Sequence, residues 1–325
     1  MSPDGRTKAL PVEGISKIAA GQSHLLLLDR KGRLFACGIN DNAQLGLPTD
    51  RGKLIITPRD ITDLILVSFR PHGDKQSLRI TNIFAAGNCS WCEISDKARK
   101  FIVGWGCNSH GQLGVGKIDI EKEESQRLAF RERPICLKTF TNLQISSICG
   151  GIDFTLFLTR CGKVFACGRG DFGQLGHLQP LQHRYKSKDG SKRAFLCPRP
   201  IQLKHGTLQS KYMDLDLKKV AVCEQAVLPA LGGSTHKYMP SKPDGLFDMP
   251  PIAQISANSR SACAISKCGK LFVWGDNYCG QLALGDLTEN IPFGMLPIQI
   301  EFKHKHVQCL EASMGWGHLL VRANL

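Results

Sequence analysis

The chain has 325 residues, 42% of them hydrophobic, which is enough for a substantial core and excludes a disordered protein. Lysine and arginine number 42 against 28 aspartates and glutamates, and the net charge of +14 favours acidic partners such as nucleic acid, an anionic membrane or an acidic protein face. Residues 1–14 lack the apolar core of a signal peptide, and no apolar run is long enough to span a bilayer. We therefore expect a protein that is cytoplasmic, nuclear or both, and not secreted.

Fourteen cysteines are spread through this long chain, which indicates reduced thiols rather than a disulfide framework. The one C-x-x-C, Cys89 to Cys92, has no second pair at zinc spacing. In a strand these two residues would point to opposite faces. We expect small buried side chains here, and neither a metal site nor another cofactor.

Residues 1–14 are expected to form an N-terminal tail, and a hairpin follows it. IAAGQSHLLLLDRKGRLFACG, residues 18–38, contains two apolar runs joined by a turn that ends at Gly32. Glycine adopts the positive backbone angle that such a tight antiparallel turn needs. The next loop runs from Asn40 through Gln44 and Leu45 to Gly46.

GWGCNSHGQLGVGK, residues 104–117, repeats that loop and also fits the G-x-x-x-x-G-K pattern of phosphate-binding loops. Ile118 stands where such a loop needs a hydroxyl group for magnesium. The other copies of the loop have no lysine at this place, so we interpret the glycines as turn residues and expect no nucleotide site.

Two further copies follow, ICGGIDFTLFLTRCGKVFACG at residues 148–168 and ISANSRSACAISKCGKLFVWG at residues 255–275. Their turns end at Gly162 and Gly269. The four loops place glutamine at the same position, and we expect each of these amides to hydrogen-bond to the backbone in a buried site. The glutamines are Gln44, Gln112, Gln174 and Gln281.

The combined pattern is A-G-x-x-H, then G-x-[VL]-[FY]-x-[WC]-G, then N-x-x-G-Q-L-G. It resembles the regulator of chromosome condensation repeat family over most of residues 15–176 and 252–321. The resemblance implies an all-β fold, a β-propeller in which repeats of about fifty residues form seven blades. We expect a single propeller domain over residues 15–325. His24 and His318 occupy the repeat histidine position, where we expect a buried structural role.

The repeats are irregular in two places. The second has Asp96 to Arg99 in place of a turn glycine, and the last two glutamines are 107 residues apart, against 68 and 62 for the earlier pairs. That gap fits two repeats, so we expect a degenerate repeat and loops around residues 177–252. The count gives five or six blades. The ring is then irregular, or closed by partial blades at the termini, or the chain is a shortened form.

Function in a propeller lies in its loops. The sequence has no Ser-His-Asp order, no paired carboxylates in a known motif and no cofactor fingerprint, so we expect no catalytic activity of its own. In the exchange factors of the family, acidic residues in the loop after A-G face the GTPase, and Asp153 stands at such a position. The corresponding loops carry Gln22, Cys89 and Ser259, all uncharged. Capping of backbone amides is the alternative role for Asp153.

A basic insertion occupies residues 183–200 and holds one acidic residue, Asp189. A polyanion or chromatin contact and a solvated loop are both open interpretations. Its candidate contact residues are Arg184, Lys186, Lys188, Lys192 and Arg193.

The sequence favours a platform or adaptor that presents loops to a protein partner. The alternatives are a guanine nucleotide exchange factor for a Ran-like or other small GTPase, and a chromatin- or nucleic-acid-associated factor that acts through the basic loop. We expect no small-molecule substrate and no insertion into a membrane.

Overall fold

The computed structural model describes residues 12–49, 54–67, 69, 78–96, 99–116, 130–140, 143–176, 194–204, 246–248, 250–284, 293–300, 302 and 307–324. The chain forms two compact units. Unit 1 contains residues 1–109 and 118–142, and unit 2 contains residues 110–117 and 143–325.

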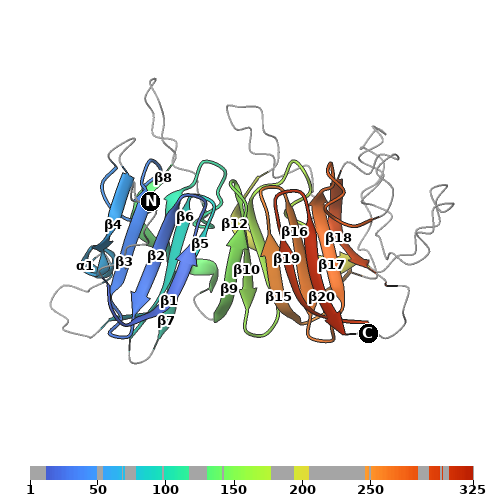
Figure 1. Ribbon diagram of the computed structural model, residues 1–325, viewed down its shortest axis with the longest axis horizontal. Helices are drawn as coiled ribbons and strands as arrows, with labels where there is room; N and C mark the ends of the chain where they lie inside the picture. The colour runs from blue at the N-terminus through green and yellow to red at the C-terminus, as the bar shows by residue number, and fades with distance from the viewer. Residues whose placement is uncertain are drawn as a thin grey trace, which may run out of the picture. The chain divides into compact units, whose positions relative to one another are not determined.

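Unit 1 holds two four-stranded antiparallel sheets, each with its strands in chain order (Figure 1). The first sheet consists of β1 (Ile15–Ala20), β2 (His24–Asp29), β3 (Leu34–Ile39) and β4 (Leu54–Asp60). The second consists of β5 (Arg79–Ala86), β6 (Cys89–Ser95), β7 (Lys100–Cys107) and β8 (Phe130–Cys136). The short helix α1 (Thr62–Val67) follows β4, and a 3-10 turn, Lys138–Phe140, follows β8.

Unit 2 repeats this architecture with two four-stranded sheets and two pairs of strands. The third sheet consists of β9 (Ile145–Gly150), β10 (Phe154–Thr159), β11 (Val164–Arg169) and β12 (Ala194–Pro200). The fourth consists of β15 (Ile252–Ala257), β16 (Ser261–Ser266), β17 (Leu271–Asp276) and β18 (Phe293–Ile300). The pairs are β13 (Gln202–Lys204) with β14 (Leu246–Asp248), and β19 (Gln308–Met314) with β20 (Leu319–Asn324).

These four-stranded meanders are the blades of a β-propeller, so the expected all-β fold class is confirmed. The second strands β10 and β16 are buried at every residue, because both of their faces are covered. Their sequences are accordingly near-continuous apolar runs rather than alternating ones. The fourth strands each contain proline, which is tolerated at a sheet edge because it has no N–H to donate. These prolines are Pro58, Pro134, Pro198, Pro200 and Pro297.

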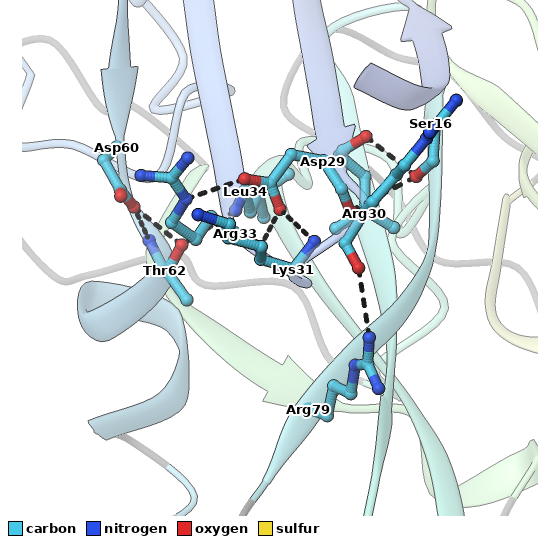
Figure 2. Close-up of polar contacts among 10 residues, drawn as sticks. Ser16, Asp29, Arg30, Lys31, Arg33, Leu34, Asp60, Thr62 and Arg79 are labelled. Carbon is cyan, nitrogen blue, oxygen red and sulfur yellow. Dashed lines mark hydrogen bonds and ion pairs between the residues drawn. The ribbon is translucent and has the colours of Figure 1, made fainter. Parts of the chain in front are cut away.

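The turns between the second and third strands are closed by a side chain as well as by glycine. Asp29 Oδ1 accepts hydrogen bonds from the backbone N–H groups of Lys31 and Arg33, each at 2.8 Å, and Asp29 Oδ2 pairs with Arg33 Nε at 2.7 Å (Figure 2). In the third and fourth sheets the hydroxyl groups of Thr159 and Ser266 accept the equivalent N–H bond. Gly32, Gly162 and Gly269 have φ angles of +82°, +91° and +81°.

The second sheet makes its turn without glycine. Asp96 Oδ1 accepts a hydrogen bond of 2.6 Å from the N–H of Arg99, and the Asp96 N–H donates to the Arg99 carbonyl at 3.0 Å. The missing glycine therefore did not prevent the β6–β7 hairpin. Cys89 lies on β6 together with Cys92, as the interpretation of that segment as a strand required.

The glutamine loops follow the third strand of each four-stranded sheet, and two of them accept an indole hydrogen bond from the next sheet. All four glutamines are buried, and each Oε1 accepts a backbone N–H from the residue two positions earlier, at 2.8–2.9 Å. The Gln44 carbonyl accepts a hydrogen bond from the Trp105 indole at 3.1 Å, and the Gln174 carbonyl accepts one from the Trp274 indole at 3.0 Å. The expected bonds are present, and the backbone of the same loop anchors the following sheet.

The Gln174–Trp274 bond bears on the long gap in the repeats. It joins the third sheet directly to the fourth, and the Ile252 N–H adds a second link to the Gly162 carbonyl at 2.9 Å. The two sheets on either side of the gap are therefore direct neighbours. Most of the expected degenerate repeat, residues 205–245, lies outside the described residues, as do residues 1–11 of the expected tail.

In the part of the chain that the structure describes, no helix has both the length and the apolar character needed to cross a bilayer.

Candidate functional site

The first and third strands of each sheet run in the same direction, so the loops that follow them lie at one edge of the sheet. We call this the loop edge. In unit 2 it is formed by residues 151–153, 170–176, 258–260, 277–282 and 315–318.

A glycine at the end of each third strand shapes this edge. A β-carbon on any of these glycines would lie 2.3–2.5 Å from a main-chain oxygen in the loop after the first strand, and all four have φ above +100°. The residue after each glycine donates its N–H to that same oxygen at 2.8–3.1 Å. Only glycine fits such a close approach. The glycines are Gly38, Gly106, Gly168 and Gly275, and the oxygens belong to Ser23, Asn88, Asp153 and Arg260.

This backbone pattern corrects the sequence comparison for Asp153. The structurally equivalent residues are Ser23, Asn88 and Arg260. Each is the chain neighbour of the residue named in the sequence comparison, where Gln22, Cys89 and Ser259 were paired with Asp153. Arg260 is a cation, and none of the three equivalent residues is acidic. Counting along the quoted copies at residues 18–38, 148–168 and 255–275 gives the same pairing of Asp153 with Ser23 and Arg260.

The carboxylate of Asp153 lies between two basic side chains. His110 Nδ1 is 3.5 Å from its Oδ1, and an Arg169 nitrogen is 3.7 Å from its Oδ2. Arg169 also pairs with Asp171 through Nε at 2.7 Å. Asp153 is thus part of a local network of ion pairs, and its side chain is only 28% exposed. The contact with a partner and the amide cap that the sequence suggested for Asp153 stay predictions.

Arg260 continues the charged network toward the fourth sheet. Its guanidinium lies over the Phe172 ring, 4.2 Å from the ring centroid, and reaches Asp276 at 4.0 Å. A cation over an aromatic face is held electrostatically and by contact with the ring. More than half of the Arg260 side chain is exposed, so it remains available to a partner.

Two aromatic residues project from neighbouring loops of this edge. Tyr278 is 87% exposed and Trp316 is 83% exposed. Their loops are adjacent, because a β-carbon on Gly317 would lie 3.5 Å from Cβ of Cys279. Together with Arg260 they form the aromatic–arginine cluster, defined as Arg260, Tyr278 and Trp316.

The sequence did not single out these three residues. Tyr278 stands inside the fourth N-x-x-G-Q-L loop and Trp316 inside the last A-x-x-G-W-G-H loop, so both are large apolar residues in surface turns. This pattern could have identified them, because a large apolar side chain in a surface turn is not needed for packing between strands.

The two repeat histidines have different surroundings. His24 is buried, its Nε2 lies 2.9 Å from Ser90 Oγ, and burial lowers its pKa to about 4. His318 is exposed, so the expectation of a buried role is wrong for that residue. The physical reason is position: Ser90 belongs to the sheet that follows the His24 sheet, whereas His318 precedes β20, the last described strand. Gly46, with φ of +68°, packs against the Trp105 indole.

The predicted contact residues of the basic loop, Arg184, Lys186, Lys188, Lys192 and Arg193, lie outside the described residues. Among the residues that are described, no group of three or more His, Cys, Asp or Glu side chains is arranged to hold a metal ion.

Comparison with known proteins gives two family models with the same description, the regulator of chromosome condensation (RCC1) repeat. One matches residues 15–44, 145–174 and 252–281, and the other matches residues 103–158, 161–212 and 268–321. The matched segments contain all four glutamines, the first three strands of the first sheet and every strand of the third and fourth sheets.

Two curated relatives and one solved structure are similar over most of the chain. The probable E3 ubiquitin-protein ligase HERC6 of Homo sapiens is 25% identical over 288 residues, 88% of this chain and 20% of that protein. The secretion-regulating guanine nucleotide exchange factor of Bos taurus is 27% identical over 307 residues, 89% of this chain and 57% of that protein. The crystal structure of Prp20p from Saccharomyces cerevisiae has a TM-score of 0.63 at 21% identity, covering 96% of this chain and 57% of that one.

The chain therefore spans between a fifth and about three-fifths of the length of these relatives. The likeness to Prp20p supports the propeller fold, and the repeat models match segments of all four four-stranded sheets. The chain belongs to the regulator of chromosome condensation (RCC1) repeat family.

Proposed function

We propose that the chain is a protein-interaction platform, a propeller domain over residues 15–325 that binds a protein partner through the loop edge of unit 2. The observation that carries this proposal is the aromatic–arginine cluster. Tryptophan, tyrosine and arginine are the residue types most enriched at the energetic centres of protein interfaces. An isolated exposed aromatic residue needs no explanation, but two on adjacent loops beside a partly exposed arginine form a suitable anchor.

The charged residues of this edge favour binding over catalysis. Asp153, Asp171 and Asp276 each lie within 4.0 Å of an arginine nitrogen, so their charges are used to hold the loops. A platform needs such a pre-formed edge, because loops that are already ordered lose less entropy when the partner binds.

The test compares variants of the full chain as bait in cell extract, with captured proteins measured quantitatively. Trp316→Ala and Tyr278→Ala should each remove the specific partner. Ile56→Ala removes a side chain that is 77% exposed on β4 of unit 1 and serves as the matched control. The proposal fails if the three variants and the parent capture the same proteins in equal amounts.

A second candidate function is guanine nucleotide exchange on a Ran-like or other small GTPase. The similarity to the bovine exchange factor favours it. An exchange factor must bind the nucleotide-free GTPase more tightly than the nucleotide-bound form. The purified chain should then accelerate release of fluorescent GDP from at least one member of a GTPase panel, and Asp153→Ala should reduce that acceleration. Absence of acceleration across the panel at micromolar protein would eliminate this candidate and leave the platform.

Twelve cysteines in the described part of the chain are free thiols. This supports a reducing compartment, and we propose a cytoplasmic or nuclear location. Fractionation of cells that express the tagged chain would test it.

A further inference from the structure

We infer that Asn258 is a positioning residue that holds the loops of Arg260 and Trp316 in their binding arrangement. The inference rests on the proposed function and assigns a role to a residue that departs from the repeat. Asn258 follows β15, and its N–H donates to the Ser261 carbonyl at 2.9 Å. Gly21 and Gly315 make the same backbone bond, to His24 and His318 respectively. Asn258 therefore occupies a position at which these repeats have glycine.

The structure explains why the fourth sheet accepts asparagine where positions 21 and 315 have glycine. A β-carbon on Gly21 would lie 2.1 Å from the His24 ring, and one on Gly315 would lie 2.2 Å from the His318 ring. The fourth sheet has the small residue Ser261 at the ring position, so a side chain fits there. The two departures from the repeat, Ser261 for histidine and Asn258 for glycine, are sterically linked.

The carboxamide of Asn258 joins two loops. Its Oδ1 accepts hydrogen bonds from the N–H groups of Arg260 at 2.9 Å and Ser261 at 2.7 Å. Its Nδ2 donates to the carbonyls of Gly315 at 2.9 Å and Trp316 at 3.4 Å. Both partners on the oxygen side are donors and both on the nitrogen side are acceptors, so the orientation of the amide is defined by its surroundings.

Trp316 depends on this connection more than a buried tryptophan would. Its indole is almost entirely exposed, so packing does little to fix the 315–318 loop. The two hydrogen bonds from Asn258 act on the backbone that carries the indole, and the other two act on the backbone that carries Arg260. Asn258 thus fixes the spacing between two members of the cluster, and this pre-organisation lowers the entropy lost on binding.

Two variants separate the local turn from the connection between loops. Asn258→Asp keeps an oxygen for the Arg260 and Ser261 N–H groups but loses the donor to Gly315 and Trp316. Asn258→Gly loses both sets of bonds but restores the residue found at positions 21 and 315, so the fold should tolerate it. Each variant is labelled with 5-fluorotryptophan and examined by fluorine NMR without a partner. The chain has four tryptophans, Trp91, Trp105 and Trp274 are buried, and Trp316→Phe assigns the fourth signal.

Both variants should shift the Trp316 signal and leave the other three in place. Both should also weaken binding of the partner that Trp316→Ala loses, by about five- to tenfold, as expected for one neutral hydrogen bond. An unshifted Trp316 signal in both variants would overturn the inference. If Trp316→Ala abolishes binding, a shifted Trp316 signal with unchanged affinity in both Asn258 variants would also overturn the inference. If Trp316→Ala leaves binding intact, the proposed function has failed, and the NMR result still decides whether Asn258 holds the loop.

Discussion

The first and fourth sheets have different residues, with different contacts, at the same position of the repeat. In the first sheet it is His24, which is buried and lies 2.9 Å from Ser90 Oγ of the next sheet, and Ser90 in turn donates to the Gln44 carbonyl at 2.6 Å. In the fourth sheet the position is Ser261. Gln254 and Ser256 bond to the following strand β19, and Asn258 adds bonds to the loop after β19 near the surface.

This difference distinguishes a residue that stabilises the fold from residues of the candidate binding site. A buried polar connection holds the first two sheets together, and the loop around it keeps the glycine of the repeat. In the fourth sheet Asn258 adds a connection near the surface, and Arg260, Tyr278 and Trp316 remain exposed around it. In this chain the candidate binding surface consists of residues at variable positions of the repeat, beside two positions, Asn258 and Ser261, that depart from it.

The largest expected effect comes from placing the asparagine of the fourth sheet in the first. Gly21→Asn forces a side chain against the His24 ring and should lower the free energy of unfolding by about 2–4 kcal/mol, the range for overpacking in a core. His24→Ser in the same chain should recover part of this loss by making room. Urea unfolding of the two single variants and the double variant measures the coupling. Additive effects would show that the two positions are not sterically linked.

The pH dependence of stability is the second prediction. The pKa of His24 is lowered to about 4 by burial, from an ordinary value of 6.5. Between pH 6.5 and pH 4 the unfolded chain binds a proton at this residue and the folded chain does not, so the free energy of unfolding decreases as the pH falls. At pH 5 the contribution of His24 is a loss of about 2 kcal/mol relative to pH 7. His24→Gln should remove this part of the pH dependence. A parent and variant with the same difference between the two pH values would contradict the assignment.

The glutamine loops give the third prediction. Gln112→Ala and Gln174→Ala each remove a buried acceptor and leave a backbone N–H of the loop without its partner, at a cost of about 1–2 kcal/mol. Both variants should melt at lower temperature than the parent in a calorimetric scan. If both melt like the parent, the glutamines do not hold the blades together.

The basic loop should affect binding without affecting stability. Changing Lys186, Lys188, Lys192 and Arg193 to glutamate should lower the salt concentration that elutes the chain from heparin or DNA, because fewer cations remain to displace counterions. Equal elution of parent and variant would leave this segment as solvated surface.

The repeat pattern was sufficient to predict the blades. Apolar runs, turn glycines such as Gly32 and the buried glutamines all follow from local sequence, because each has a short-range backbone requirement. The pattern also survives the loss of the turn glycine in the second sheet, where Asp96 closes the turn instead.

Less of the candidate site could be predicted from the sequence. The pairing of Asp153 with Arg169 and His110 joins two loops and the end of β11, and the contact of Arg260 with the Phe172 ring joins loops of the third and fourth sheets. The direct contact between the third and fourth sheets across the gap of 107 residues is likewise a property of tertiary packing. None of these contacts can be derived from the spacing of residues along the chain.

We propose the aromatic–arginine cluster as the binding surface of the chain. The most direct measurement is the affinity of the purified partner, identified by capture, for the parent, Trp316→Ala and Ile56→Ala. Truncating a central aromatic anchor typically costs at least about 2 kcal/mol, so Trp316→Ala should weaken binding by about thirtyfold or more, while Ile56→Ala should match the parent. Equal affinities for the parent and Trp316→Ala would contradict the account.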